Sequence, residues 1–347
     1  MSTCFSPFPL TSLRLRFNCQ AETPLRLGGL RAGSNLRGAL VGVMRRSTCA
    51  ASDFYPLTSP AEKRVEGRRQ SLSSEEISAH TAHCPVCWMV AANDHPGEER
   101  RGYVITPPLG FPESLQPSEA FDFRITLFGD ASRYLPYFVL AVPEAGRGGI
   151  GVGRGRFVLK SICAEHPLTG DWQVLKEGEN LVKPPAEMVS QAAIQQSAEA
   201  FAARLGTGQP RLRMDFPTPL RLILGERLVK SPDFGVIFSH ILKRIDDLAI
   251  QYAGGMVRPA KERQHLWNLA NRVRLVESQV YWADVPSGSS RTSQPTWISG
   301  LVGTAWYSSP LEVWRELLPW LLWGEITQVG KDTAKGNGVF RIKADRG

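Results

Sequence analysis

The chain has 347 residues, of which 42% are hydrophobic and 21% charged, and this composition predicts a globular protein with room for two domains. Its longest charge-free run, residues 292–311, contains two prolines and many serines and threonines, so no membrane span is expected. The formal net charge of +8 favours an anionic partner.

The first 50 residues contain seven arginines and one acidic residue, Glu22. Arg-rich, acid-poor starts are typical of organelle transit peptides. Residues 13–17, however, alternate apolar and basic side chains with a period of two, and we therefore favour a folded strand over a targeting signal. Six cysteines without a secretory apolar segment predict a reducing, cytoplasmic location.

The first half is predicted to continue with a helix over residues 33–47 that begins at Ser34 or Asn35. Residues 51–80 are polar and are interpreted as a long loop. The strict alternation of residues 121–128 predicts a strand. The next apolar segment, 134–142, fits a short helix as well as a strand, and the glycine run that starts at Gly146 leads into a strand ending near Ile162.

The second half is predicted to restart this pattern after a helix near 185–205 and a linker at 207–210. The strand and turn predicted at 211–222 end in Thr-Pro-Leu-Arg-Leu, the same five residues that follow the first strand. A helix is then expected to begin with Ser231 as its cap and Pro232 in its first turn. It is expected to stop at Gly254-Gly255.

A capping box at Ser309–Glu312 predicts a last helix that runs toward Pro319. Together these elements predict an α+β protein of two tandem ferredoxin-like βαββαβ domains. The first domain covers residues 1–206, with a Cys/His-containing insertion at 51–105. The second covers residues 211–347 and contains a C-terminal glycine-rich loop.

Two glycine-rich stretches, 151–155 and 330–338, resemble parts of phosphate-binding fingerprints. A Rossmann or Walker loop must follow a strand and open a helix, whereas both of these loops precede strands. The sequence therefore argues against a nucleotide cofactor. Such loops can still offer backbone N–H groups and lysines to a polyanion.

His80, His83, Cys84 and Cys87 form an H-x2-H-C-x2-C cluster that suits a structural zinc ion. Because four ligands within eight residues are crowded, a distant ligand such as Cys49 is a further candidate. The alternative interpretation is a polar loop with reduced cysteines. No other cofactor is expected to be required.

The sequence contains no G-x-S-x-G or H-E-x-x-H motif, and the adjacent Asp246 and Asp247 project about 100° apart on a helix. RNA can be cut without a metal because it carries its own nucleophile, the 2′-hydroxyl group. Candidates for that chemistry are His240 on the polar face of its helix, with Lys331, Lys335 and Arg291 as phosphate contacts.

Several pieces, in this order, resemble the CRISPR precursor-RNA-processing endoribonucleases of the RAMP superfamily. They include "CPVC…RGYVITPP" (84–108), "FRITLFGDA" (123–131), "GRGGIGVGRGRF" (146–157), "FSHILKRIDDLAIQYAGG" (238–255) and "LLPWLLWGEITQVGKDTAKGNGVFRI" (317–342). The terminal glycine-rich loop is the strongest mark of the resemblance, which runs over most of the chain.

The resemblance implies two RRM/RAMP-like domains that bind CRISPR repeat RNA and cut precursor crRNA once per repeat without a metal. It also implies that the product stays bound or passes to a CRISPR effector complex. The RNA contacts predicted on this basis are Arg14, Arg16, Arg45, Arg46, Lys243, Arg244, Ser290, Gly330, Lys335, Gly336 and Gly338.

Two departures leave the proton carrier open. Related enzymes often have histidine two residues before the Gly330-Lys331 pair, where this chain has Gln328, and the helix at 33–47 contains no histidine. Either His240 moves the proton, or Arg37, Arg291 and Lys331 act by positioning and charge. The alternative function is a non-catalytic RNA-binding subunit, and a remoter one is a zinc-stabilised protein unrelated to RNA.

Overall fold

The computed structural model describes residues 8–51, 62–65, 68–71, 73–91, 101–178, 182–185, 187–287 and 296–345. The first sheet is built around β1 (Ser12–Ala21), in which Leu13, Leu15, Phe17 and Cys19 face the core and the alternate residues face away. Its strands are antiparallel neighbours in the order β4 (Tyr103–Thr106), β5 (Ala120–Phe128), β1, β6 (Phe157–Glu165) and β7 (Trp172–Glu177).

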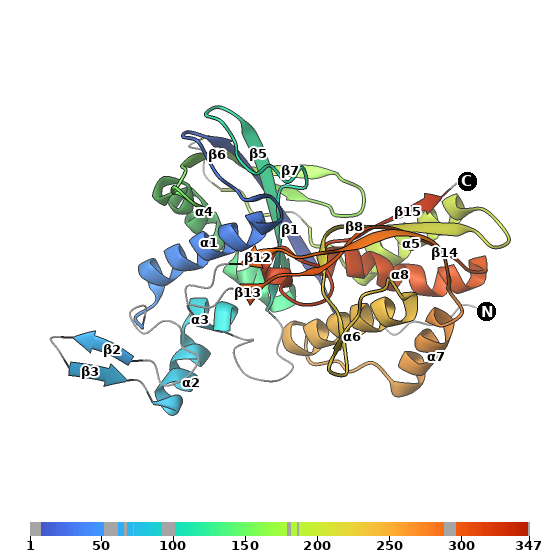
Figure 1. The fold of residues 1–347 in the computed structure, drawn as a ribbon. Coiled ribbons are helices and arrows are strands. Elements are labelled where there is room, and N and C mark those ends of the chain that lie inside the picture. Colours follow the sequence, from blue (N-terminus) through green and yellow to red (C-terminus); the bar gives the residue numbers. More distant parts are fainter. Residues whose placement is uncertain are drawn as a thin grey trace.

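Two helices, α1 (Ala32–Thr48) and α4 (Leu135–Gly148), pack against the core face of this sheet (Figure 1). The segment at 134–142 is therefore helical. Pro136 lies in its first turn, where a backbone N–H would have no partner within the helix, so the N–H that proline lacks costs no hydrogen bond. The prediction that α1 begins at Ser34 or Asn35 was wrong. A short 3-10 turn, η1 (Gly29–Arg31), precedes α1, which begins at Ala32 without a side-chain cap.

The segment predicted as a long loop contains regular structure. A hairpin of β2 (Glu62–Val65) and β3 (Arg68–Ser71) projects from the first half, followed by α2 (Ser74–His83) and α3 (Pro85–Ala91) (Figure 1). A reciprocal capping box between Ser73 and Glu76 begins α2. The loop prediction missed this signal because the segment has few apolar residues.

The second sheet repeats the order of the first. Its antiparallel neighbours are β11 (Arg274–Ala283), β14 (Gly300–Ser308), β8 (Arg211–Leu220) and β15 (Arg341–Asp345). The helices on its core face are α6 (Phe234–Tyr252), α7 (Ala260–Ala270) and α8 (Leu311–Thr327). Two short pairs, β9 (Ile223–Leu224) with β10 (Arg227–Leu228) and β12 (Pro286–Ser287) with β13 (Thr296–Trp297), complete this half.

Each half therefore follows the predicted order strand, helix, two strands, helix, strand, and β1 and β8, the strands with the shared sequence echo, occupy equivalent positions. Two predicted boundaries were wrong. The cap of α6 is Asp233, whose side chain accepts the Val236 N–H at 2.8 Å, and not Ser231. Pro319 lies inside α8, which continues to Thr327.

Segments from the first part of the chain pack in the core of the second half. Helix α5 (Gln191–Leu205), which precedes the predicted domain boundary, packs on α8 and belongs to the second core. Phe8, from the start of the chain, joins the same core, with its ring 5.4 Å from that of Trp320. The domain limits at 206 and 211 stay a prediction.

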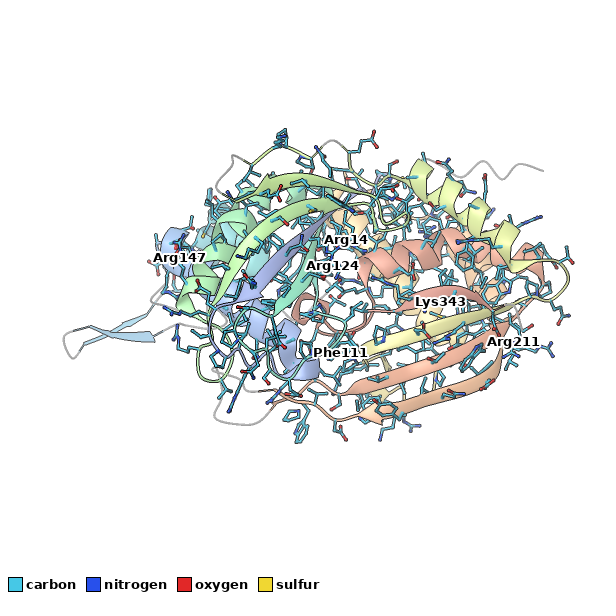
Figure 2. All side chains as sticks on the ribbon, turned by 90° about the horizontal axis from the view of Figure 1, so that it is seen from above. Arg14, Phe111, Arg124, Arg147, Arg211 and Lys343 are labelled. Carbon is cyan, nitrogen blue, oxygen red and sulfur yellow. The ribbon has the colours of Figure 1, made fainter. Side chains whose placement is uncertain are left out.

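The faces of the two sheets that carry no helices bear charged side chains. Figure 2 shows Arg14 and Arg124 on the first sheet and Lys343 and Arg211 on the second. Arg124 pairs with Glu165 at 3.1 Å, and Lys343 pairs with Asp215 at 3.0 Å. No helix in the described part of the chain is long and apolar enough to cross a membrane.

Candidate functional site

The glycine-rich loop of the second half lies directly on α1 of the first half. A Cβ atom on Gly33 would lie 2.3 Å from the carbonyl oxygen of Lys335 and 2.9 Å from the Cα of Gly336. Gly336 in turn approaches Pro107, next to β4. We call this contact between the start of α1 and residues 328–338 the α1–loop junction.

Gln328 holds one side of the α1–loop junction. It ends α8 with a φ of 56°, an unusual value for a residue with a side chain, and is 1% exposed. Its Nε2 donates to the carbonyl oxygen of Ile105 and to Oγ1 of Thr106, both at 3.0 Å. The side chain therefore fastens the second half to β4 and does not face a substrate.

The loop itself is a rigid turn. Gly338 has a φ of 71°, and a Cβ there would lie 1.7 Å from the Val329 oxygen, so the position requires glycine. The N–H of Gly336 donates to Thr333 and that of Gly338 to Pro219. These two amides are bonded within the fold, and the RNA contacts of Gly336 and Gly338 stay a prediction. Gly330, with a φ of 90°, is half-buried.

The two lysines of the loop differ in their surroundings. Lys331 is exposed at the edge of the α1–loop junction, and its backbone N–H donates to Arg221. Lys335 is half-buried, and its Nζ lies 2.7 Å from Oδ1 of Asp332. Lys331 is therefore the better placed of the two to contact a polyanion.

Three predicted RNA-binding arginines are buried. Arg14 is 3% exposed and donates to Thr126, and burial followed by the charge of Arg341 lowers its pKa to about 9. Arg244 is 5% exposed and donates to the Thr327 oxygen at 2.7 Å, and Arg45 is 4% exposed. The predicted surface role of these three was wrong, because period-two and helical patterns do not distinguish a basic surface from a buried guanidinium.

The other predicted basic contacts are accessible. Arg46 is exposed at the end of α1, and Arg37 is half-buried on the same helix. Arg16 pairs with Asp122 at 2.9 Å, and Lys243 lies 3.4 Å from Asp247. Ser290 and Arg291 lie outside the described residues.

His240 is engaged through both ring nitrogens. Nδ1 lies 2.9 Å from the Val236 oxygen, and Nε2 lies 3.0 Å from the Ile223 oxygen. Both partners are backbone carbonyl oxygens, so both ring nitrogens lie against groups of the fold itself. The geometry leaves no ring nitrogen directed at a substrate, and the catalytic role of His240 stays a prediction.

The Cys/His cluster closes around the end of α1. Cys49 follows the last residue of α1, His80 lies on α2, Cys84 lies between α2 and α3, and Cys87 lies on α3. Their four ligand atoms lie within 4.8 Å of one another. Cys49 Sγ is 3.2 Å from His80 Nε2 and 3.5 Å from Cys87 Sγ.

A Cys₃His set of this size matches a tetrahedral structural metal site. Burial and the neighbouring Arg45 lower the pKa of His80, which favours the neutral imidazole that metal binding requires. The prediction of His83 as a ligand was wrong: this residue is exposed, and its Nδ1 bonds to the Ala79 oxygen at 2.8 Å. Cys49, the distant candidate, takes its place.

A cavity of about 500 Å³ opens at the start of α1, and the sequence did not indicate a site there. Arg26, Arg31, Asn35, Glu113 and Ser114 line it, with Val152 from the first glycine-rich loop at its edge. The Gly28-Gly29 pair just before a helix was the signal that could have indicated a close approach there.

The family comparisons divide along the two halves. Residues 9–187, more than half of the 347, match the family AF_1859_N, described as an N-terminal domain. Residues 214–340 match the family described as the CRISPR-associated endoribonuclease Cas6. No curated protein sequence matches the chain.

Solved structures match nearly the whole chain at low identity. A Cas6 product complex has a TM-score of 0.54 at 15% identity, covering 96% of this chain and 99% of that chain. Thermus thermophilus Cas6 has a TM-score of 0.52 at 13% identity over 96% and 99%. A partial Cas6-RT-Cas1–Cas2 complex has a TM-score of 0.60 at 11% identity over 97% and 46%. At these identities the likeness is one of fold.

Proposed function

Residues 214–340 match the Cas6 family of CRISPR-associated endoribonucleases, and from this premise we propose that the chain is a Cas6-type enzyme that binds CRISPR repeat RNA and cleaves precursor crRNA once within each repeat. The observation that carries the proposal is the match of residues 214–340 to the Cas6 endoribonuclease family, and the full-length likeness in fold to a Cas6 product complex agrees with it. The basic net charge of +8 suits an RNA partner.

We propose that cleavage uses the RNA's own 2′-hydroxyl group and requires no metal. The protein then has to hold that oxygen in line with the phosphorus and stabilise the developing negative charge. We assign Arg37 on α1 and the exposed Lys331 to phosphate contacts on the two sides of the α1–loop junction. Arg291 is a third candidate for this role, and Arg46 extends the basic surface along α1.

We also propose that Cys49, His80, Cys84 and Cys87 bind a structural Zn²⁺ ion. The four residues come from the end of α1, from α2 and α3, and from the residue between those two helices, so a bound ion would cross-link this small segment to α1. Its role is to hold α1 in place, because all four coordination positions are filled by protein ligands.

Incubation of the purified protein with labelled repeat RNA in EDTA tests the reaction. Specific cleavage at one position per repeat is expected, and an RNA with a 2′-deoxy group at that position should stay intact. Cutting of the deoxy substrate contradicts attack by the 2′-hydroxyl group. Cleavage that depends on added Mg²⁺ contradicts metal independence.

The second candidate function is a non-catalytic subunit that holds repeat RNA in a CRISPR ribonucleoprotein complex. The observation that favours it is that Gln328 serves as a fastening between the two halves and that both ring nitrogens of His240 are bonded to carbonyl oxygens. Tight binding of a repeat RNA without scission of any repeat tested would support this candidate over the enzyme.

A further inference from the structure

The cavity at the start of α1 combines a carboxylate with two guanidinium groups. Glu113 and Ser114 contribute from the loop after β4, Arg26 from the segment after β1, Arg31 from η1, and Asn35 from α1. Arg26, Arg31 and Glu113 are the charged groups that line it. The cavity thus has two cations available for an anionic ligand beside one base.

The position of Glu113 is fixed by its backbone. Its carbonyl oxygen accepts the Gly28 N–H at 3.0 Å, and the carbonyl oxygen of Pro112 accepts the Gly29 N–H at 3.3 Å. Phe111, two residues before it, has a φ of 46°, which is a strained value for an aromatic residue. Strain of this kind persists where the surrounding structure holds a segment in a required place.

The carboxylate itself lies against η1. A Cβ on Gly29 would lie 2.5 Å from Oε1 of Glu113, so any side chain at position 29 would displace the carboxylate. On the opposite side, Asn35 donates from Nδ2 to the Leu27 oxygen at 2.9 Å, which ties the start of α1 to the segment carrying Arg26. A Cβ on Gly151 would lie 2.0 Å from the Arg26 oxygen, so the first glycine-rich loop also depends on glycine at this contact.

The cavity adjoins the α1–loop junction. Both lie at the start of α1: Ser34, which lines the cavity, directly follows Gly33, where an added Cβ would meet the Lys335 carbonyl oxygen. The cavity and the junction therefore share one end of α1, so an RNA strand bound at the junction lies close to the cavity. This continuity makes a phosphodiester the anionic ligand that the charges favour.

We propose that this cavity receives the scissile phosphodiester, that Arg26 and Arg31 bind its non-bridging oxygens, and that Glu113 is the general base. The inference rests on the proposed ribonuclease function. Glu113 accepts the proton of the 2′-hydroxyl group, and the 2′-oxygen forms a bond to phosphorus. The bond from phosphorus to the 5′-oxygen breaks, and that oxygen takes a proton from water. The products are a 2′,3′-cyclic phosphate and a 5′-hydroxyl end.

Glu113 provides a general base in a cavity that no histidine lines. Glutamate acts as a general base in the same way as histidine, and removal of a positioned base typically lowers a rate by about 10²–10⁴-fold. Arginine matches the geometry of phosphate oxygens through paired N–H groups. The cavity therefore contains both components that scission by the 2′-hydroxyl group needs.

The test measures single-turnover cleavage at saturating protein together with RNA affinity. Glu113→Gln should lower the cleavage rate by about 10²–10⁴-fold while binding of a 2′-deoxy repeat RNA stays within about twofold. Glu22→Gln, an exposed carboxylate outside the cavity, is the matched control and should cleave normally. Arg31→Ala should weaken both binding and cleavage, and Arg31→Lys should restore part of each.

A second readout separates a base from a structural residue. Glu113→His places an imidazole where the carboxylate was, so it should restore part of the activity lost in Glu113→Gln and change the pH–rate profile. Wild-type cleavage that Glu113→Gln leaves unchanged overturns this inference and keeps the proposed function. Absence of cleavage by the wild type on cognate repeat RNA overturns both. An equal loss of binding and cleavage in Glu113→Gln also overturns the role as base.

Discussion

Nε2 of Gln328 lies 3.0 Å from Oγ1 of Thr106, and this contact joins the end of α8 in the second half to β4 in the first. The same nitrogen also reaches the Ile105 oxygen at 3.0 Å, and the side chain is 1% exposed. Gln328 thus fastens the two halves together.

Gln328→Ala is expected to lower the free energy of unfolding by about 1–3 kcal/mol, because it leaves the buried Ile105 carbonyl and Thr106 hydroxyl without their donor. Urea denaturation measures the change. Gln195→Ala, on the exposed face of α5, is the control and should change stability by less than about 0.5 kcal/mol. Equal stability of Gln328→Ala and the wild type would contradict the fastening role.

The order of strands and helices in each half was predictable because period-two and three-four patterns report directly on buried faces. The same hydrophobic patterns gave little information about the contacts between the two halves. The burial of Arg14 and Arg244 depends on contacts between distant segments, as does the packing of α5 on α8, and no local pattern reports those contacts.

The candidate metal-binding cluster was predicted in part for the same reason. The Cys-x2-Cys spacing of Cys84 and Cys87 indicates two metal ligands from the sequence alone. Whether Cys49 or His83 is a further ligand depends on where α1 ends relative to α2. The proposed role of Glu113 was not predictable from the sequence. Its loop crosses the start of α1, about eighty residues earlier in the chain, and no local pattern around an exposed glutamate predicts that contact.

Gly33→Ala should disturb the α1–loop junction, since its new Cβ would lie 2.3 Å from the backbone oxygen of Lys335. We expect weaker repeat-RNA binding and a loss of about 1–3 kcal/mol of stability through overpacking. Gly38→Ala on the same helix meets no atom within 4 Å and should raise stability by about 0.5–1 kcal/mol. Fluorescence anisotropy and urea denaturation distinguish the two variants. Parallel behaviour of the pair would show that the junction tolerates a side chain.

The Cys/His cluster is expected to bind one zinc ion per chain. Elemental analysis of the purified protein measures the content, and Cys84→Ser should lower it to near zero with partial loss of stability, because a tetrahedral site loses a thiolate ligand. Cys163→Ser, a buried cysteine outside the cluster, should retain the metal. Full zinc content in Cys84→Ser would exclude the proposed ligand set.

Asp215 should make stability depend on pH in the acid range. Burial alone raises the pKa of this carboxyl, but hydrogen bonds from Arg213, Lys343 and Thr304 outweigh burial and hold the pKa below its usual value. A carboxyl with a lowered folded-state pKa stabilises the protein above its unfolded-state pKa, near 3.9, and loses that contribution as the pH falls through the folded-state value. Asp215→Asn should therefore cost about 1 kcal/mol at pH 7, where the ion pairs are partly exposed. The difference from the wild type should shrink below about pH 4.

Glu226→Gln, in an exposed turn, should show no such dependence. Denaturation midpoints of the three proteins between pH 3 and pH 7 provide the measurement, and a constant gap between Asp215→Asn and the wild type over that range would refute the ionic origin of the effect.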